Sequence, residues 1–200
     1  MTELANGETS NGAVADVTSL APDRLARLEH LLELQDIRDT LTRFSRGMDR
    51  FDRELFLSAF HPDAVIAAGP FVGGPVELYE WASPMHEAGQ NATHHNLLNL
   101  TCEIDGDTAH TELYYLFVGR NRDDSNWIAG GRYIDRLERR DGEWKIALRT
   151  NAIEWSGLVP TMDIPFTDVP DLFLNGAPSR SKEDPSYQRP LTNKRQRNLP

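Results

Sequence analysis

Apolar residues recur at helical spacing through residues 25–48, and polar or charged residues fill most positions between them. The repeat is most regular in its second half, at Ile37, Leu41, Phe44 and Met48. Side chains three or four positions apart lie on one face of a helix, so this stripe can pack against a core. The pattern predicts a long amphipathic helix that ends near Asp49, with that carboxylate close to the buried edge.

Two shorter helices and a strand are expected after the long helix. Asp52 can cap a helix over residues 53–60, because its carboxylate can accept hydrogen bonds from the free N–H groups of the first turn. Pro62 ends that helix, since proline disfavours helical backbone at the preceding residue. A short strand over residues 64–68, turns rich in Gly and Pro, and a third helix over residues 76–86 follow.

The second half of the chain has a strand-like pattern that is interrupted by turn sequences. Asp105-Gly106-Asp107 and Asp141-Gly142 favour tight hairpin turns. The strands expected around them cover residues 93–104, 108–118, 127–140 and 143–155. Helices followed by a meander of long strands are typical of an α+β fold. We expect a cone-shaped α+β barrel, in which N-terminal helices pack on a curved antiparallel sheet and enclose a cavity.

Composition divides the chain into three parts. Residues 1–22 are rich in Gly, Ser, Thr, Asn and Ala, and we expect them to be disordered. Residues 23–157 carry the regular patterns and form the folded domain. Residues 158–200 contain prolines that break any long element, together with several large apolar residues. We expect this extended tail to wrap on the domain surface or to cross to another subunit of a homo-oligomer, a dimer or a trimer.

Charge and cysteine content exclude several classes of function. A net charge of −10 over 200 residues argues against a nucleic-acid-binding surface. The basic residues Lys194, Arg195 and Arg197 are interpreted as a solvated tail. No apolar run is long enough to span a membrane, and the start of the chain lacks a secretory signal, so we expect a cytoplasmic protein. The single cysteine, Cys102, allows no internal disulfide.

Asp49 and His95 are the candidate catalytic pair. A histidine that a carboxylate orients is a common general base, although a strand histidine can also be an ordinary core residue. Adjacent strand residues point to opposite faces, so His94 faces away if His95 faces the core, and a shift of one residue exchanges them. Arg46 and Arg50 are the alternative partners of Asp49.

Metal and cofactor sites are not expected. The six histidines and one cysteine lack a metal-ligand spacing, and the sequence contains no glycine-rich phosphate loop. Every second side chain of a strand points to the same face, but this alternation does not decide which face of the sheet points inward. The sets that share a face are Leu113, Tyr115 and Phe117; Trp127, Ala129, Gly131 and Tyr133; and Arg149, Asn151 and Ile153. The small residues of the second set would leave room for a ring-sized ligand.

Several segments, in this order, resemble the SnoaL-like group of the nuclear transport factor 2-like superfamily. They are residues 37–49, 60–65, 93–95, 131–137 and 139–146, followed by Arg149. The resemblance covers residues 25–156, which is the folded domain by composition. It is specific for the fold. It implies no single activity, because this superfamily includes dehydratases, dehydrochlorinases, isomerases, polyketide cyclases and binding domains that are not catalytic.

The resemblance also implies a site inside the barrel. Asp49 and His95 take the places of the catalytic aspartate and histidine of hexachlorocyclohexane dehydrochlorinase, and Arg149 takes that of its pocket arginine. With this face turned inward, the candidate substrate-binding residues are Phe44, Trp81, Leu113, Tyr115, Phe117, Trp127 and Asn151. Phe44 stands where the dehydrochlorinase has a lysine and bile-acid dehydratases a tyrosine, and Phe117 replaces an aspartate of the latter. Neither activity therefore carries over intact.

These residues together predict a cofactor-independent lyase that acts on a small apolar molecule, aromatic or cyclic. His95, held by Asp49, would remove a proton, and elimination or retro-aldol cleavage would follow, while Arg149 and Tyr115 stabilise the developing charge. An isomerase or polyketide-type cyclase would use the same base. A ligand-binding or assembly subunit without catalytic activity is the other alternative.

Overall fold

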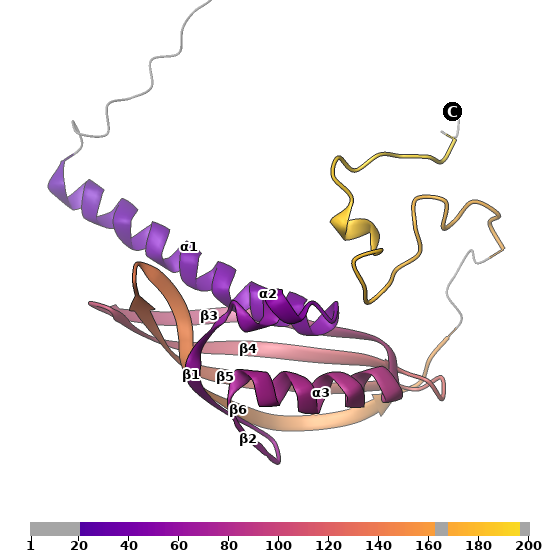
Figure 1. The fold of residues 1–200 in the computed structure, drawn as a ribbon, viewed down its shortest axis with the longest axis horizontal. Coiled ribbons are helices and arrows are strands. Elements are labelled where there is room, and N and C mark those ends of the chain that lie inside the picture. The colour runs from indigo at the N-terminus through magenta and orange to yellow at the C-terminus, as the bar shows by residue number, and fades with distance from the viewer. Residues whose placement is uncertain (1–20, 163–167, 197–200) are drawn as a thin grey trace, which may run out of the picture.

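The computed structural model describes residues 21–162 and 168–196. Three helices, α1 (Pro22–Asp49), α2 (Arg53–Leu57) and α3 (Pro75–Gly89), lie on one face of a curved sheet (Figure 1). The strands are β1 (Phe60–Ala68), β2 (Phe71–Gly73), β3 (Gln90–Asp105), β4 (Thr108–Asn121), β5 (Asn126–Arg140) and β6 (Glu143–Val159). Nearly all of the N-terminal segment that the sequence predicts to be disordered lies outside the described residues.

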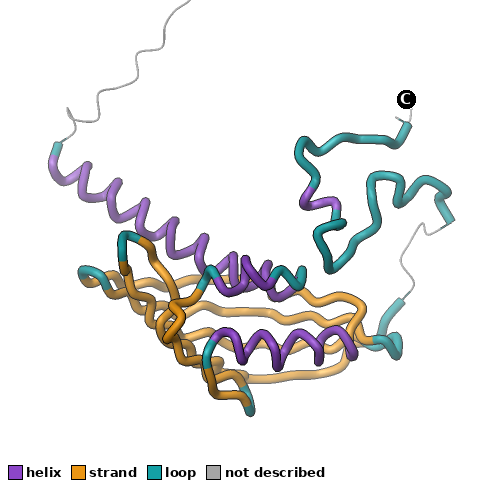
Figure 2. Tube along the Cα trace, in the orientation of Figure 1, coloured by secondary structure: helices purple, strands orange, loops and turns teal. Residues whose placement is uncertain are grey.

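The six strands, orange in Figure 2, form one sheet in the order β2-β1-β6-β5-β4-β3. Only β1 and β6 pair in parallel, and the other neighbours are antiparallel. The predicted α+β class and the packing of helices on a curved sheet are confirmed. The sheet does not close into a complete barrel, because β2 and β3 are its two edges within the described part of the chain.

The two halves of α1 have different surroundings. The C-terminal half is buried along the predicted stripe, with Ile37, Leu41, Phe44 and Met48 all at most 5% exposed. The N-terminal half extends beyond the sheet (Figure 1), so its leucines between residues 25 and 32 are exposed. Gly47 permits α2 to pack closely on this helix, because a Cβ there would lie 2.4 Å from the backbone nitrogen of Phe56. The end of α1 is thus fixed against the core.

The boundaries around α2 differ from the prediction. Asp52 caps the helix as expected, accepting a hydrogen bond from the backbone N–H of Leu55 at 3.3 Å. The helix ends at Leu57 rather than residue 60, and β1 already begins at Phe60. Pro62 therefore lies in a strand, at an irregularity in the pairing of β1 with β6. Proline has no N–H to donate to a regular ladder of hydrogen bonds, so it is tolerated where the strand pairing is irregular.

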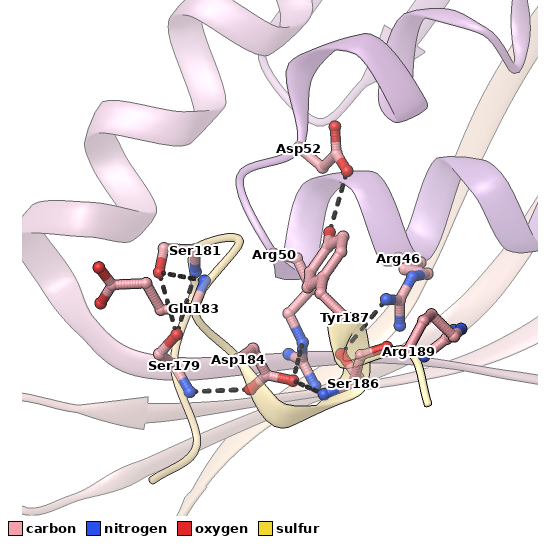
Figure 3. Close-up of polar contacts among 10 residues, drawn as sticks. All are labelled: Arg46, Arg50, Asp52, Ser179, Ser181, Glu183, Asp184, Ser186, Tyr187 and Arg189. Atoms are coloured by element: carbon pink, nitrogen blue, oxygen red, sulfur yellow. Dashed lines mark hydrogen bonds and ion pairs between the residues drawn. The ribbon is translucent and has the colours of Figure 1, made fainter. Parts of the chain in front are cut away.

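The C-terminal segment lies against the domain that precedes it. Among its described residues, the one regular element is the 3₁₀ turn η2 (Pro185–Tyr187), and the Tyr187 hydroxyl donates to Asp52 at 2.9 Å (Figure 3). Arg46 at the end of α1 donates to Ser186 at 3.2 Å, and Arg50 lies 3.8 Å from the carboxylate of Asp184. These contacts join the segment to the junction of α1 and α2.

The basic cluster near the C-terminus is only partly described. Arg195 makes an ion pair with Asp171 at 3.1 Å, within the same C-terminal segment, and Arg197 lies outside the described residues. No helix in the described ranges is long and apolar enough to cross a membrane. The cytoplasmic location stays a prediction.

Candidate active site

A cavity of about 450 Å³ lies between the helices and the concave face of the sheet. Its walls come from α1, β1, α3 and all four long strands, and they are mostly apolar. The polar side chains among them include His86, His95, Tyr115, Arg149 and Asn151. A largely apolar cavity with a few converging polar groups is the usual form of a small-molecule site.

Asp49 is in direct contact with His95, which lines this cavity. The Nδ1 of His95 lies 2.6 Å from one carboxylate oxygen of Asp49, and the backbone N–H of His95 donates to the other oxygen at 2.8 Å. Because an ionised carboxylate can only accept, Nδ1 carries the proton. The opposite ring nitrogen, Nε2, then keeps its lone pair for a group inside the cavity.

The surroundings of Asp49 favour its ionised form. Burial alone would raise the pKa of this carboxyl, but the hydrogen bonds and charge of His95 outweigh that effect and lower the pKa. A carboxylate at the C-terminal end of a helix faces an unfavourable dipole, so an imidazolium that forms beside it when His95 takes up a proton would compensate it. Arg46 and Arg50, the alternative partners, bind the C-terminal segment instead.

The two adjacent histidines of β3 separate as strand geometry requires. His94 is exposed on the outer side, whereas His95 lines the cavity. The ring of His95 packs near two apolar rings, with centroid distances of 4.9 Å to Phe117 and 6.0 Å to Phe44. These rings limit how the imidazole can turn, and Asp49 fixes its orientation.

Arg149 has a different environment from the one that the sequence hypothesis requires. It is 1% exposed, and it donates to both oxygens of Asp135 at 2.7 and 2.6 Å. Its guanidinium lies between two rings, 4.1 Å from the centroid of Phe44 and 4.3 Å from that of Tyr133. Only Nη1 lacks a hydrogen-bond partner among the described residues. Most of its capacity to bind an anion is already taken up by Asp135.

Most of the other predicted residues line the cavity: Phe44, Trp81, Tyr115, Phe117, Trp127 and Asn151. Tyr115 stacks on Tyr133 with a centroid distance of 4.4 Å, and burial raises the pKa of the Tyr115 hydroxyl, so it stays protonated and can donate. Trp81 remains 41% exposed and stacks on Phe71 at the rim, which fits a residue that closes one end.

Two expectations about the wall need correction. Leu113 does not line this cavity, because it is buried in the core and borders a separate groove next to Leu41. Gly131 does not provide room for a ligand either. A Cβ at that position would lie 2.1 Å from the carbonyl oxygen of Ala152, so glycine serves the close approach of β5 and β6 at a bulge.

Sequence reasoning missed His86, which is 7% exposed and lines the cavity from α3. Its ring centroid lies 6.0 Å from that of His95. A signal for it exists, because His86 follows the buried residues Leu78 and Ala82 at intervals of four on one face of α3. Its Nδ1 lies 3.1 Å from the side-chain oxygen of Gln90.

The described residues contain no cluster of three or more His, Cys, Asp or Glu side chains that could hold a metal ion. At the site itself, His95 and Asp49 bind each other and His86 binds Gln90. Asp135 is occupied by Arg149.

Solved structures share this fold at low sequence identity. A hexachlorocyclohexane dehydrochlorinase of Novosphingobium barchaimii is 19% identical, over 69% of this chain and 97% of that chain, with a TM-score of 0.61. A Novosphingobium aromaticivorans protein named after scytalone dehydratase is also 19% identical, over 69% and 95%, with a TM-score of 0.59. A Mycobacterium tuberculosis protein of unknown function is 22% identical, over 81% and 87%, with a TM-score of 0.59.

At these identities the likeness shows a common fold, and each activity belongs to the protein that is named for it. No curated protein matches the chain. The model of the SnoaL-like domain matches residues 29–150, which include the last three-quarters of α1 and most of the sheet. The match spans more than half of the chain and contains Asp49, His95 and Arg149, so the chain belongs to the SnoaL-like family of the nuclear transport factor 2-like superfamily.

Proposed function

We propose that this protein is a cofactor-independent lyase that acts on a small, mostly apolar ring compound, with His95 as its general base. The observation that carries the proposal is the 2.6 Å contact between Asp49 and the Nδ1 of His95, a residue that lines an apolar cavity. That contact leaves Nε2 as the basic nitrogen that can reach a bound molecule. A positioned base of this kind contributes about 10²–10⁴-fold to a rate.

In the proposed reaction, Nε2 of His95 takes a proton from a C–H or O–H group of the substrate. In an elimination, the C–H electron pair forms a new C=C bond while the leaving group departs with its own bonding pair. In a retro-aldol cleavage, the O–H pair forms a carbonyl, a C–C bond breaks, and the carbon fragment takes up a proton. Asp49 stabilises the imidazolium that forms, since its lowered pKa keeps it ionised beside the ring.

Tyr115 and Arg149 have unequal parts in this mechanism. The neutral hydroxyl of Tyr115 can donate a hydrogen bond to a leaving group or to a developing oxyanion within the cavity. Arg149 contributes a fixed positive charge, but two of its three nitrogens are committed to Asp135. We therefore assign the donor role chiefly to Tyr115 and only the free Nη1–H of Arg149 to the site.

The fold relatives support the reaction class without defining it. One is named as a dehydrochlorinase of hexachlorocyclohexane and another after a dehydratase, and both names denote eliminations. The cavity volume of about 450 Å³ is sufficient for a small ring compound such as those that these names denote. Catabolism of aromatic compounds is the biological setting that we propose for this activity.

The test is to incubate the purified protein with a panel of hydroxylated and halogenated ring compounds and to measure product masses. A lyase yields two fragments whose masses sum to that of the substrate. An isomerase or a cyclase that only rearranges bonds yields one product of unchanged mass, and a binding protein without activity yields none. A single product of unchanged mass, or no product at all, would contradict the lyase and favour the corresponding alternative. His95→Ala provides the blank, because it removes the base from an otherwise intact cavity.

We also propose that the chain forms a homo-oligomer, a dimer or a trimer, through the N-terminal half of α1. Four leucines on this projecting part of the helix are exposed in the single chain: Leu25, Leu28, Leu31 and Leu32, at 38%, 39%, 56% and 66%. Exposed apolar side chains that cluster in this way are typical of contact surfaces. Light scattering coupled to size-exclusion chromatography tests this, with a double Leu28→Ser and Leu32→Ser variant expected to be monomeric and a wild-type monomer contradicting it.

A further inference from the structure

A chain of hydrogen bonds runs from the surface loop after β4 to the imidazole of His86. Asp123 accepts from the Ser125 hydroxyl at 2.6 Å, and the Ser125 oxygen accepts from the amide nitrogen of Asn121 at 2.8 Å. The Asn121 side-chain oxygen then accepts from the amide nitrogen of Gln90 at 3.0 Å. The remaining side-chain oxygen of Gln90 lies 3.1 Å from the Nδ1 of His86.

Each link of this chain has only one possible polarity. The Asp123 carboxylate can only accept, so the single proton of the Ser125 hydroxyl points to it. Asn121 must therefore offer its NH₂ to Ser125 and its oxygen to Gln90. Gln90 in turn offers its NH₂ to Asn121 and its oxygen to the ring. Through this chain the exposed carboxylate of Asp123 fixes the tautomer of His86, with the proton on Nδ1 and a lone pair on Nε2.

His86 is held firmly and in a neutral state. Burial is the largest influence on its pKa and lowers it, and the guanidinium of Arg180 in the C-terminal segment lowers it further. Arg180 also donates to the backbone carbonyl oxygens of His86 and Gln90, at 3.0 and 2.9 Å. The end of α3 is therefore tied on one side to the loop after β4 and on the other to the C-terminal segment.

The inventory of charges and hydrogen-bonding groups in the cavity selects a kind of ligand. In the state in which His95 acts as the base, His86 and His95 each present a bare Nε2, and among the described residues neither of these atoms has a partner. The positive charge of Arg149 is paired with Asp135, and the negative charge of Asp49 is attracted to the nearby guanidinium of Arg180. The two bare Nε2 atoms are hydrogen-bond acceptors, so this part of the cavity matches a group that donates hydrogen bonds.

We propose that His86 is a specificity-determining residue whose Nε2 accepts a hydrogen bond from a hydroxyl group on the ring compound. The proposal rests on the proposed function for the identity of the cavity as the substrate site. It narrows the substrate class to ring compounds with at least one hydroxyl group. The ring centroids of His86 and His95 lie 6.0 Å apart, so one ligand can reach the base and the acceptor together.

The first test needs no substrate and no variant. Nitrogen-15 NMR of the full chain, with labelled histidine, reports which ring nitrogen of His86 carries the proton at pH 7. The expected spectrum shows a protonated Nδ1 and a bare Nε2. A proton on Nε2, or on both nitrogens, would overturn the proposal because His86 would then be a donor to the cavity.

The second test compares the affinities of phenol, toluene and benzoate, which share one ring and differ in the group it carries. The wild type is expected to bind phenol about tenfold more tightly than toluene, because one hydrogen bond distinguishes them. It should also bind benzoate more weakly than phenol, because a carboxylate has no proton to donate to Nε2. His86→Leu should remove the preference for phenol while toluene affinity is retained, which also shows that the variant is folded. His95→Leu is the matched control and should keep the preference. A preference that disappears in His95→Leu and survives in His86→Leu would contradict the assignment.

These outcomes separate this proposal from the proposed function. Once a substrate is in hand, His86→Leu is expected to raise KM more than it lowers kcat, whereas loss of the base lowers kcat. If no ring compound is turned over but phenol is still preferred through His86, only the lyase is wrong. If turnover depends on His95 but His86→Leu changes neither KM nor the preference for phenol, only the role of His86 is wrong.

Discussion

Two carboxylate–nitrogen pairs each contribute their nitrogen-bearing residue, His95 or Arg149, to the wall of the same cavity and differ in which hydrogen-bonding atoms they leave free. Asp49–His95 and Asp135–Arg149 both close to 2.6 Å. The arginine pair is sealed, with side chains 1% and 0% exposed, whereas His95 and Asp49 keep 10% and 13%. The guanidinium uses two nitrogens on its partner, while the imidazole uses one ring nitrogen and leaves the other open to the cavity.

This difference assigns the two pairs to different tasks. A guanidinium stays protonated at any pH at which the protein is folded, so Asp135–Arg149 moves no proton and instead holds β5 against β6. An imidazole gains and loses its proton near neutral pH, so Asp49–His95 can carry out acid–base chemistry. Within one cavity, a short distance between opposite charges does not by itself identify the catalytic pair. A titratable nitrogen with access to the ligand does.

Breaking the sealed pair should give the largest effect on stability. Arg149→Met leaves the carboxylate of Asp135 buried without a partner, so we expect the free energy of unfolding to fall by about 3–5 kcal/mol. Urea denaturation measures it. The double variant Asp135→Leu with Arg149→Met removes both charges and should recover most of the loss. If the double variant is as unstable as the single one, the cost does not come from the unpaired charge.

Changing the open pair should instead affect turnover. Asp49→Asn retains the shape but loses the charge that stabilises the imidazolium, so we expect kcat to fall by about 10²–10⁴-fold. The unfolding free energy should change less than in Arg149→Met, because no bare charge is left in the interior. Steady-state kinetics and urea denaturation of the same preparation check both parts. A large stability loss with little loss of kcat would make this pair structural as well.

Acidification offers a second comparison of wild type with Asp49→Asn. The pKa of Asp49 is lower in the folded protein than its ordinary value of 3.8, so its ionised form contributes stability above that value. This contribution is lost as the pH falls below 3.8 through the folded pKa. Urea midpoints between pH 5 and pH 3 should therefore fall more steeply for the wild type than for Asp49→Asn. Parallel curves would show that His95 does not favour the ionised carboxylate.

Phe44 lies close to both pairs, and its substitution should have the smallest effect of the changes considered. Its ring lies 4.1 Å from the guanidinium of Arg149 and 6.0 Å from the centroid of His95. Phe44→Leu keeps most of the apolar volume and loses the ring face beneath the cation, so we expect a cost of about 1–2 kcal/mol in unfolding free energy. A double-mutant cycle should give stronger coupling with Arg149→Met than with His95→Ala, and equal couplings would argue against the distinction between the pairs.

The local pattern of the sequence predicts much of this molecule. The helical stripe through Phe44 and Met48, the cap at Asp52 and the Asp-Gly turns all correspond to elements of the structure. These features depend on residues that are close together in the chain. The bounds of α2 were wrong because β1 begins at Phe60, where pairing with β6 overrides the local preference.

The partner of Arg149 could not be predicted in the same way. Counting back from the Asp141-Gly142 turn in a regular hairpin places Ile134 opposite Arg149. A bulge between Arg136 and Leu137 shifts the register by one residue and brings Asp135 opposite instead. The sequence pattern does not show the bulge, so neither the ion pair nor the reduced role of Arg149 follows from it.

The role of the C-terminal segment was open for a related reason. Its contacts, such as Tyr187 with Asp52 and Arg180 with the carbonyl oxygens at the end of α3, join residues about 90 to 135 positions apart. No periodicity links such positions. The sequence therefore indicates only that the segment is too apolar to be a simple linker, and the structure is needed to show where it binds.

The most direct measurement of the central claim is kcat/KM of His95→Ala beside His94→Ala, on a substrate identified by product mass. The two histidines are adjacent on β3, but His95 faces the cavity and His94 is exposed. We predict a loss of about 10²–10⁴-fold for His95→Ala and a rate close to that of the wild type for His94→Ala. Equal rates for the two variants would contradict the assignment of His95 as the base.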